Sequence, residues 1–199
     1  MKDGWEAKTL GELGFAARES TEVSPGPEYE LWSVPSFAED EPEISRGSEI
    51  RSAKLRVLPN DVLVCKMHPR INRVWRVRQP AEHREQIAST ERLVFRTHSD
   101  AGLLQSSLIH LVSAPAFREW IVSEVSGATG SHTRAKADGV LRQQVPIPPI
   151  SEQQRIVGIL DEAFSGIATA RENAERNLRN ARAPFESHLE CLFTLPADG

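Results

Sequence analysis

The stretch that decides the fold of this chain runs from Pro146 to Val157 and reads PIPPISEQQRIV. Its prolines restrict the backbone φ angle and lack an amide donor, so they predict an extended segment that is not helical. Ser151, followed three residues later by Gln154, has the pattern of a capping box, and the acidic Glu152 suits the positive end of a helix dipole. The sequence therefore predicts a helix that begins at Ser151.

Beyond this start, apolar or small residues recur at the period of one face of an α-helix. Ten steps advance 36 positions along the chain, from 156 to 192, a mean spacing of 3.6 residues. The steps alternate between three and four residues, so the stripe also fits the seam of a coiled coil. Its positions are Ile156, Leu160, Ala163, Ile167, Ala170, Ala174, Leu178, Ala181, Phe185, Leu189 and Leu192.

We expect this helix at about 151–193, with one interruption. Pro184 cannot donate to the carbonyl of Asn180, and a proline costs about 3 kcal/mol in an unbroken helix interior. We therefore expect a kink or break near 182–184, with Pro184 opening a short terminal helix. The part before the proline would span about 50 Å, which is longer than a compact small domain needs. The helix should therefore pack on something outside its own domain.

The charge of the chain, −4 overall, is distributed unevenly. Lys and Arg number 3 against 11 Asp and Glu in residues 1–44, 16 against 9 in residues 45–145, and 5 against 8 in residues 146–199. A basic centre between acidic flanks is typical of a nucleic-acid-binding domain attached to protein-binding surfaces. The overall acidity argues against a protein that coats DNA without specificity, because phosphate neutralisation drives such binding.

The sequence gives no indication of a membrane or secreted protein. It contains no run of eighteen apolar residues, and its first residues do not form a signal peptide. Its two cysteines, Cys65 and Cys191, lie far apart in the sequence, which suits a reducing compartment better than a disulfide scaffold. We therefore expect a cytoplasmic protein.

The part before the proline run combines β patterns with two short helices, so we expect an α+β fold: a β-rich domain with a few helices, followed by the long C-terminal helix. Tyrosine and tryptophan in the first strand should pack in the core, and the strand at 72–78 should bury one face and leave the other positive. A turn at 59–61 suggests a hairpin. The expected strands are 29–34, 55–58, 62–66, 72–78 and 87–96, and the expected helices are 103–112 and 116–125.

We find no constellation of catalytic residues. The glycine-rich loop at 127–133 lacks the Gly-Lys-Ser/Thr ending of a phosphate loop. Asp61 and Lys66 match part of a nuclease metal site, but Val64 stands where the second acid would be. The sequence also lacks the motif of an adenine methyltransferase. We therefore expect a chain without catalytic residues, metal or bound cofactor.

Two clusters in the basic centre carry the groups that DNA binding needs. Lys and Arg position a protein on phosphates, whereas Arg, Asn, Ser, Thr and His read base edges. One cluster lies on the strand at 72–78 and the turn before it; the other lies in the loop at 126–136, whose glycines allow close approach to a groove. The candidate DNA-binding residues are Lys66, Arg70, Asn72, Arg73, Arg76, Arg78, Thr129, Ser131, His132, Thr133, Arg134 and Lys136.

The stretch from Pro146 to Phe164, continued by Ala174–Leu178, resembles the helical spacer of specificity (S) subunits of type I restriction-modification systems. Shorter likenesses to the target-recognition domain of these subunits occur at 5–14, 66–74 and 89–91. The resemblance implies a DNA target-recognition domain at 1–148 and a helical spacer and dimerisation region at 149–199. It also implies a non-catalytic subunit that binds double-stranded DNA sequence-specifically and reads one half of a bipartite site.

The resemblance further implies protein partners. An S subunit docks methyltransferase (M) subunits and, with them, a restriction (R) subunit. S-adenosylmethionine, ATP and Mg would then be bound by these partners and not by this chain.

A complete S subunit carries two recognition domains and two antiparallel spacer helices, whereas this sequence has one of each. The simplest expectation is a two-fold homodimer paired along the apolar stripe, because an isologous contact closes on itself. Such a dimer should prefer a palindromic, two-part DNA site. Two alternatives remain: half of a split S subunit that pairs with a different chain, and, less favoured, a small metal-dependent nuclease.

Overall fold

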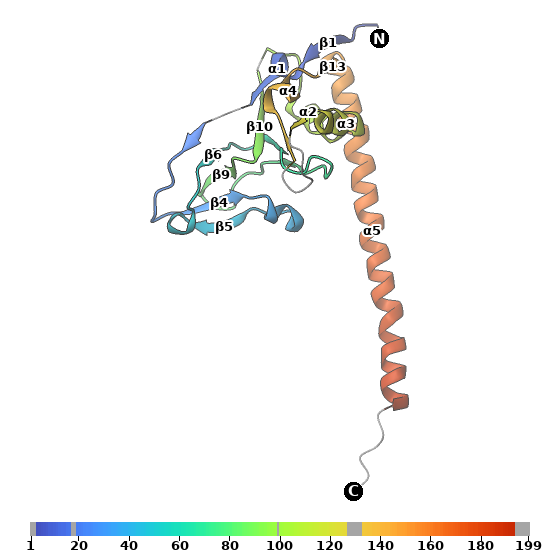
Figure 1. Cartoon of the computed structure of the whole chain (residues 1–199). Helices are drawn as coiled ribbons and strands as arrows, with labels where there is room; N and C mark the ends of the chain where they lie inside the picture. Colours follow the sequence, from blue (N-terminus) through green and yellow to red (C-terminus); the bar gives the residue numbers. More distant parts are fainter. Residues whose placement is uncertain (1–2, 17–18, 99, 127–132, 194–199) are drawn as a thin grey trace. The chain divides into compact units, whose positions relative to one another are not determined.

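The computed structural model describes residues 3–16, 19–98, 100–126 and 133–193. It forms two units, Met1–Gln154 and Arg155–Gly199 (Figure 1). The strands are β1 Glu6–Thr9, β2 Gly14–Ala16, β3 Ser20–Thr21, β4 Glu28–Trp32, β5 Glu43–Arg46, β6 Lys54–Arg56, β7 Val62–Cys65, β8 Val74–Arg76, β9 Glu85–Ser89, β10 Arg92–Thr97, β11 Val125–Ser126, β12 Arg134–Ala135 and β13 Gln144–Ile147. The helices are α1 Leu10–Leu13, α2 Gln105–Ser113, α3 Pro115–Ser123, α4 Ala137–Leu141 and α5 Ile150–Phe193, with 3₁₀ turns at Pro35–Glu39 and Gly47–Glu49. The expected α+β fold with a long C-terminal helix is confirmed.

Two larger sheets build the first unit. One has the strand order β2-β10-β7-β8, and the other has the order β3-β6-β9-β4-β5. All their pairings are antiparallel except that of β4 with β9. Two short ribbons, β1 with β13 and β11 with β12, complete the described sheets.

Strand β7 shows how the core is layered, because all four of its residues are buried. Successive side chains of a strand point to opposite faces. Val62 and Val64 accordingly pack in the cluster that contains Leu108 of α2 and Phe117 of α3, while Leu63 packs in the cluster that contains Trp32 of β4. The four-stranded sheet is therefore the middle layer, with helices on one face and residues of the five-stranded sheet on the other.

Several sequence expectations are confirmed. Tyr29 and Trp32 of β4 are buried, as expected for core residues. Trp75 and Val77 are buried, and Arg76 and Arg78 are exposed, so the strand around β8 has one apolar and one positive face. Both expected helices are present as α2 and α3.

The expected hairpin at 59–61 is wrong. Strand β6 belongs to the five-stranded sheet and β7 to the four-stranded sheet, so the turn crosses from one sheet to the other. The Asp61 amide closes the turn on the Leu58 carbonyl at 3.0 Å, and Asn60 takes a positive φ of 73°. The strand expected at 87–96 likewise divides into β9 and β10, which lie in different sheets. The alternation of apolar and polar residues along a strand does not indicate which sheet the strand joins.

Helix α5 differs from expectation at its start and at Pro184, and it ends at Phe193 as expected. It begins at Ile150, so Ser151 lies in its first turn instead of capping it, and the Gln153 amide already donates to the Pro149 carbonyl at 3.0 Å. It also continues through Pro184 to Phe193, so a break near 182–184 with a separate terminal helix is wrong, while a kink there stays a prediction (Figure 1). Asn180 is exposed, so water can solvate its carbonyl, and the proline removes one hydrogen bond without ending the helix. None of the helices in the described part of the chain combines the length and apolar character that a membrane crossing requires.

The side chain of Gln153 ties the first turn of α5 to the body of the first unit. It is 1% exposed. Its Oε1 accepts from the Leu104 amide at 2.9 Å, and its Nε2 donates to the carbonyls of Gly102 at 2.6 Å and Pro148 at 2.8 Å. One carboxamide therefore satisfies three backbone groups from two chain segments.

Replacing Gln153 by Ala should destabilise the first unit by about 2–4 kcal/mol, because backbone donors and acceptors at this junction lose their partners. Gln154→Ala is the matched control: the neighbouring glutamine is exposed, and its loss should change the free energy of unfolding by less than about 0.5 kcal/mol. Urea denaturation of the full chain measures both. Equal effects of the two substitutions would contradict the anchoring role of Gln153.

Candidate nucleic-acid interface

The fold brings together the two basic clusters that the sequence analysis proposed separately. The Ala135 amide donates to the Lys66 carbonyl at 3.0 Å, and the His68 amide donates to the Thr133 carbonyl at 3.1 Å. A β-bridge between Met67 and Arg134 lies between these bonds. The segments 66–68 and 133–135 thus pair side by side. Thr129, Ser131 and His132 lie outside the described residues, so their assignment stays a prediction.

Four of the candidate residues are engaged in contacts within the domain. Arg78 pairs with Asp40 at 2.6 Å and with Glu41 at 2.8 Å. Arg134 pairs with Glu91 at 2.8 Å. Arg73 donates to the Met67 carbonyl at 3.4 Å, and the Asn72 amide group donates to the Ser113 carbonyl at 2.8 Å. These side chains therefore already have partners within the domain.

Four other candidates have side chains without an ion pair or hydrogen bond in the part of the chain that the structure describes. Arg70, Arg76 and Lys136 are exposed, and Lys66 is half-buried. Thr133, whose backbone supports His68, is also half-buried. Cations without an internal partner are the groups best suited to meet DNA phosphates.

Arg70 stands on a turn that is fastened at several points. The Ile71 amide donates to the His68 carbonyl at 2.9 Å, and His68 takes a positive φ of 49°, which is uncommon for a residue other than glycine. The bonds of His68 to Thr133 and of Asn72 to Ser113 fix the two ends of this turn. Arg70 and the exposed Ile71 are therefore presented by a constrained backbone.

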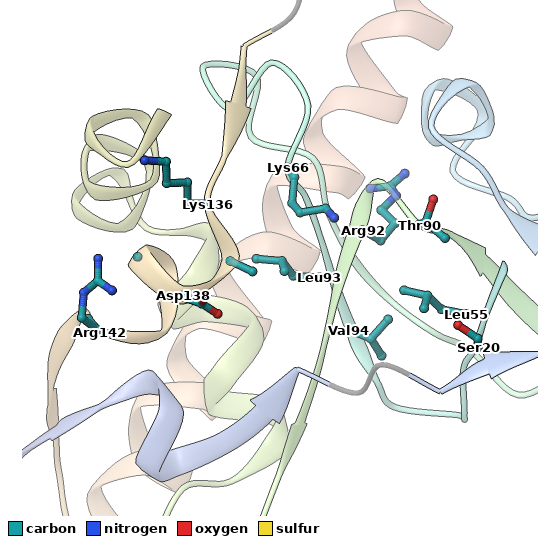
Figure 2. A pocket seen from close by; sticks show the side chains of 12 residues that line it. Ser20, Leu55, Lys66, Thr90, Arg92, Leu93, Val94, Lys136, Asp138 and Arg142 are labelled. Atoms are coloured by element: carbon teal, nitrogen blue, oxygen red, sulfur yellow. The ribbon is translucent and has the colours of Figure 1, made fainter. Parts of the chain in front are cut away.

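A cleft of about 770 Å³ opens beside the paired segments (Figure 2). It lies between α4 and its flanks, which provide Lys136, Asp138 and Arg142, and the strands β3 and β6, which provide Ser20 and Leu55. Lys66, Thr90 and the start of β10 complete its lining. We name it the basic cleft, because four of its lining residues are cationic, Lys66, Arg92, Lys136 and Arg142, and one, Asp138, is acidic.

Arg92 of the basic cleft was not among the residues proposed from sequence, and it has an unusual environment. It is 1% exposed. Its guanidinium donates to the carbonyls of Ser33 at 2.8 Å and Arg73 at 3.4 Å, and lies 5.3 Å from the centroid of the Trp75 ring. Burial lowers the pKa of Arg92 from its ordinary value; nearby Cys65 acts against this shift, and Arg73 acts with it. An arginine still keeps its proton at neutral pH.

Sequence reasoning missed Arg92 and Arg142 because each stands in a segment with little other basic character. Arg92 opens a strand of apolar residues, where only the fold reveals that its side chain borders a cleft. Register was the missing information: β10 pairs with β7 so that Arg92 lies opposite Cys65, one residue before Lys66.

Asp61, one part of the suspected nuclease fragment, is committed to a structural ion pair. Its two carboxylate oxygens accept from Arg96 Nε at 2.8 Å and Arg96 Nη2 at 2.7 Å, and one also accepts from the Leu58 amide at 2.8 Å. The hydrogen bond with Asp61 raises the pKa of Arg96. Among residues 3–16, 19–98, 100–126 and 133–193, no three His, Cys, Asp or Glu side chains gather as metal ligands would.

Asp61→Asn should therefore destabilise the domain by about 3 kcal/mol, because it removes one partner of a buried ion pair. Asp100→Asn, at an exposed aspartate, should leave the free energy of unfolding unchanged to within about 0.5 kcal/mol. Thermal or urea denaturation measures this difference. Divalent-metal-dependent DNA cleavage that Asp61→Asn abolishes without loss of stability would instead revive the nuclease alternative.

Neither a scan against models of protein families nor a search of curated proteins finds a match. Solved structures do match. The HsdS subunit from Thermoanaerobacter tengcongensis aligns with 100% of this chain and 52% of its own, at 18% identity and a TM-score of 0.72. A structure concerning complex assembly and conformational transition of the type I restriction-modification system aligns over the same shares, at 19% identity and a TM-score of 0.75.

A third match is the type I restriction-modification S subunit from M. genitalium, with 13% identity, a TM-score of 0.54, and coverage of 89% of this chain and 44% of that one. The chain therefore has the fold of type I restriction-modification S subunits, which confirms at the level of fold the resemblance seen in the sequence. It spans about half the length of the first two chains that it matches, 52% in each case.

Proposed function

We propose that this chain is a specificity subunit of a type I restriction-modification complex, which binds double-stranded DNA and reads one half of a bipartite site. The observation that carries the proposal is the match of the whole chain to half of two such structures, at TM-scores of 0.72 and 0.75. The protein would act in the cytoplasm without catalysis of its own. It would dock M and R subunits, and these would bind S-adenosylmethionine, ATP and Mg.

The first unit offers a surface suited to DNA. Arg70 and Arg76 are exposed and make no ion pair within the described residues. Arg70 sits on a constrained turn and Arg76 on β8, so neither needs a large rearrangement to meet a phosphate. A rigid element positions functional groups more accurately than a loose loop does.

Arg70→Gln combined with Arg76→Gln should weaken binding to duplexes of any sequence, because neither position would then neutralise a phosphate. The slope of log K against log salt should fall by about 1 for each residue. Arg84→Gln is the control, since Arg84 is already paired with Glu28 at 3.2 Å and Glu82 at 2.9 Å. Fluorescence anisotropy with a labelled duplex gives both affinity and slope. An unchanged slope in the double variant would remove these two residues from the interface.

The second unit offers a surface suited to a helix partner. Its described part is α5 alone, and large apolar side chains along the stripe are exposed, Ile167 by 63% and Leu178 by 53%. Ala163, Ala170 and Ala174 are exposed as well, and such small residues let another helix approach closely. Ile156 and Leu160 are half-buried. Exposed apolar stripes of this length mark interaction sites, and an isologous contact between two copies would cover both.

Ile167→Asp combined with Leu178→Asp should convert a wild-type dimer to monomers, because it places charges in the seam. Ser165→Asp combined with Asn180→Asp is the matched control: it adds the same two charges on the opposite side of the helix and should leave the dimer intact. Light scattering of the purified chain gives the mass of each variant. A wild-type monomer would contradict the homodimer proposal. It would instead support a search for a different partner chain, as a split S subunit requires.

A further inference from the structure

We propose that the basic cleft seats a phosphodiester group of the bound DNA and so positions the backbone instead of reading bases. This inference rests on the proposed function and assigns to the cleft a role that the exposed turn at Arg70 does not fill. Lys66 would contact the phosphate on one side of the cleft, and Lys136 and Arg142, on the α4 side, would attract the neighbouring backbone through their charge. Arg92 would act behind Lys66 through its charge, because its own side chain is buried.

The first support is the missing counterion of Arg92. Its two hydrogen-bonded partners are backbone carbonyls, its Nε is buried without an acceptor, and no acid in the described part of the chain pairs with it. Burying a charge without an opposite charge is costly. An anionic ligand in the adjoining cleft would offset that cost when it binds.

The second support is the arrangement of like charges. The Lys66 amine points toward Arg92 and Thr90 (Figure 2). Glu91, the acid next to these residues in sequence, is bound to Arg134 at 2.8 Å. This end of the cleft therefore presents two cations to one opening, and the one acid of the lining, Asp138, comes from α4. The charge of an anion bound between Lys66 and Arg92 would be attracted by both cations.

The third support is the chemistry of the rest of the lining. Lys136 has no ion pair within the described residues, and Arg142 reaches Glu124 only at 3.6 Å, with a side chain that is largely exposed. Thr90 and Ser20 add hydroxyl donors. Cations and hydroxyls thus line both sides of the cleft, and such groups favour phosphates, which accept hydrogen bonds in several directions. Phosphates occur at every step of the DNA backbone, so such a site favours no particular base.

The test compares two variants of the full chain with equal loss of charge. The cleft variant carries Lys66→Gln, Lys136→Gln and Arg142→Gln. The control variant carries Arg46→Gln, Arg51→Gln and Arg84→Gln, which lie outside the cleft. All six side chains are at least partly exposed, so both variants should fold. The probes are short labelled duplexes of several unrelated sequences, titrated at several salt concentrations.

We expect the cleft variant to bind every duplex at least about tenfold more weakly at low salt, with a log–log salt slope reduced by about 0.9 for each phosphate that is no longer neutralised. The control variant should keep a slope close to that of the wild type. Equal behaviour of the two variants would overturn the inference. So would weaker binding confined to particular sequences, because that would indicate base reading.

The wild-type chain separates this inference from the proposed function. If the wild type binds DNA and the Arg70 and Arg76 variant weakens binding while the cleft variant does not, the proposed function stands and the cleft inference fails. If the wild type binds none of the duplexes even at low salt, the proposed function fails and the inference fails with it.

Discussion

The organisation of this chain depends on the burial of one carboxamide. Gln153 lies in the first turn of α5, yet its side chain bonds to backbone groups of Gly102, Leu104 and Pro148. The start of the helix is therefore fixed to the strand segment before it and to the connection that leads into α2. Because buried backbone groups need partners, this polar residue stabilises the junction more specifically than an apolar residue could.

The two-sided middle sheet produces the candidate interface. Strand β7 is buried on both faces, so its position between the helices and the five-stranded sheet is determined by packing. Its register with β10 sets Arg92 opposite Cys65, and Lys66 follows directly. The segment at 133–135 then pairs beside Lys66 and His68. Lys66, Arg92 and Lys136 therefore border one cleft, because packing in the core fixes the strands and segments that carry them.

The domain uses its basic residues in two ways. Arg78, Arg96 and Arg134 are bound to acids and support the fold. Among the described residues, Arg70, Arg76, Lys66 and Lys136 make no such pair, and Arg92 is buried without one. The proposed binding of DNA would use the second group, because phosphate contacts set orientation while other groups read the bases. Charge alone does not separate the two uses; only the partners of each side chain do.

The sequence by itself determined the features that repeat at short range. The period of 3.6 in α5, the alternation around β8, the helices α2 and α3 and the basic centre all follow from local patterns, and the residues from Pro146 to Phe164 predicted the family fold. Only the tertiary structure decided which sheet each strand joins, that Gln153 is buried, that α5 continues through Pro184, and that Lys66 and Arg92 line one cleft. These four features depend on contacts between residues distant in sequence and on whether water can reach a backbone group. A local repeat in the sequence carries information about neither.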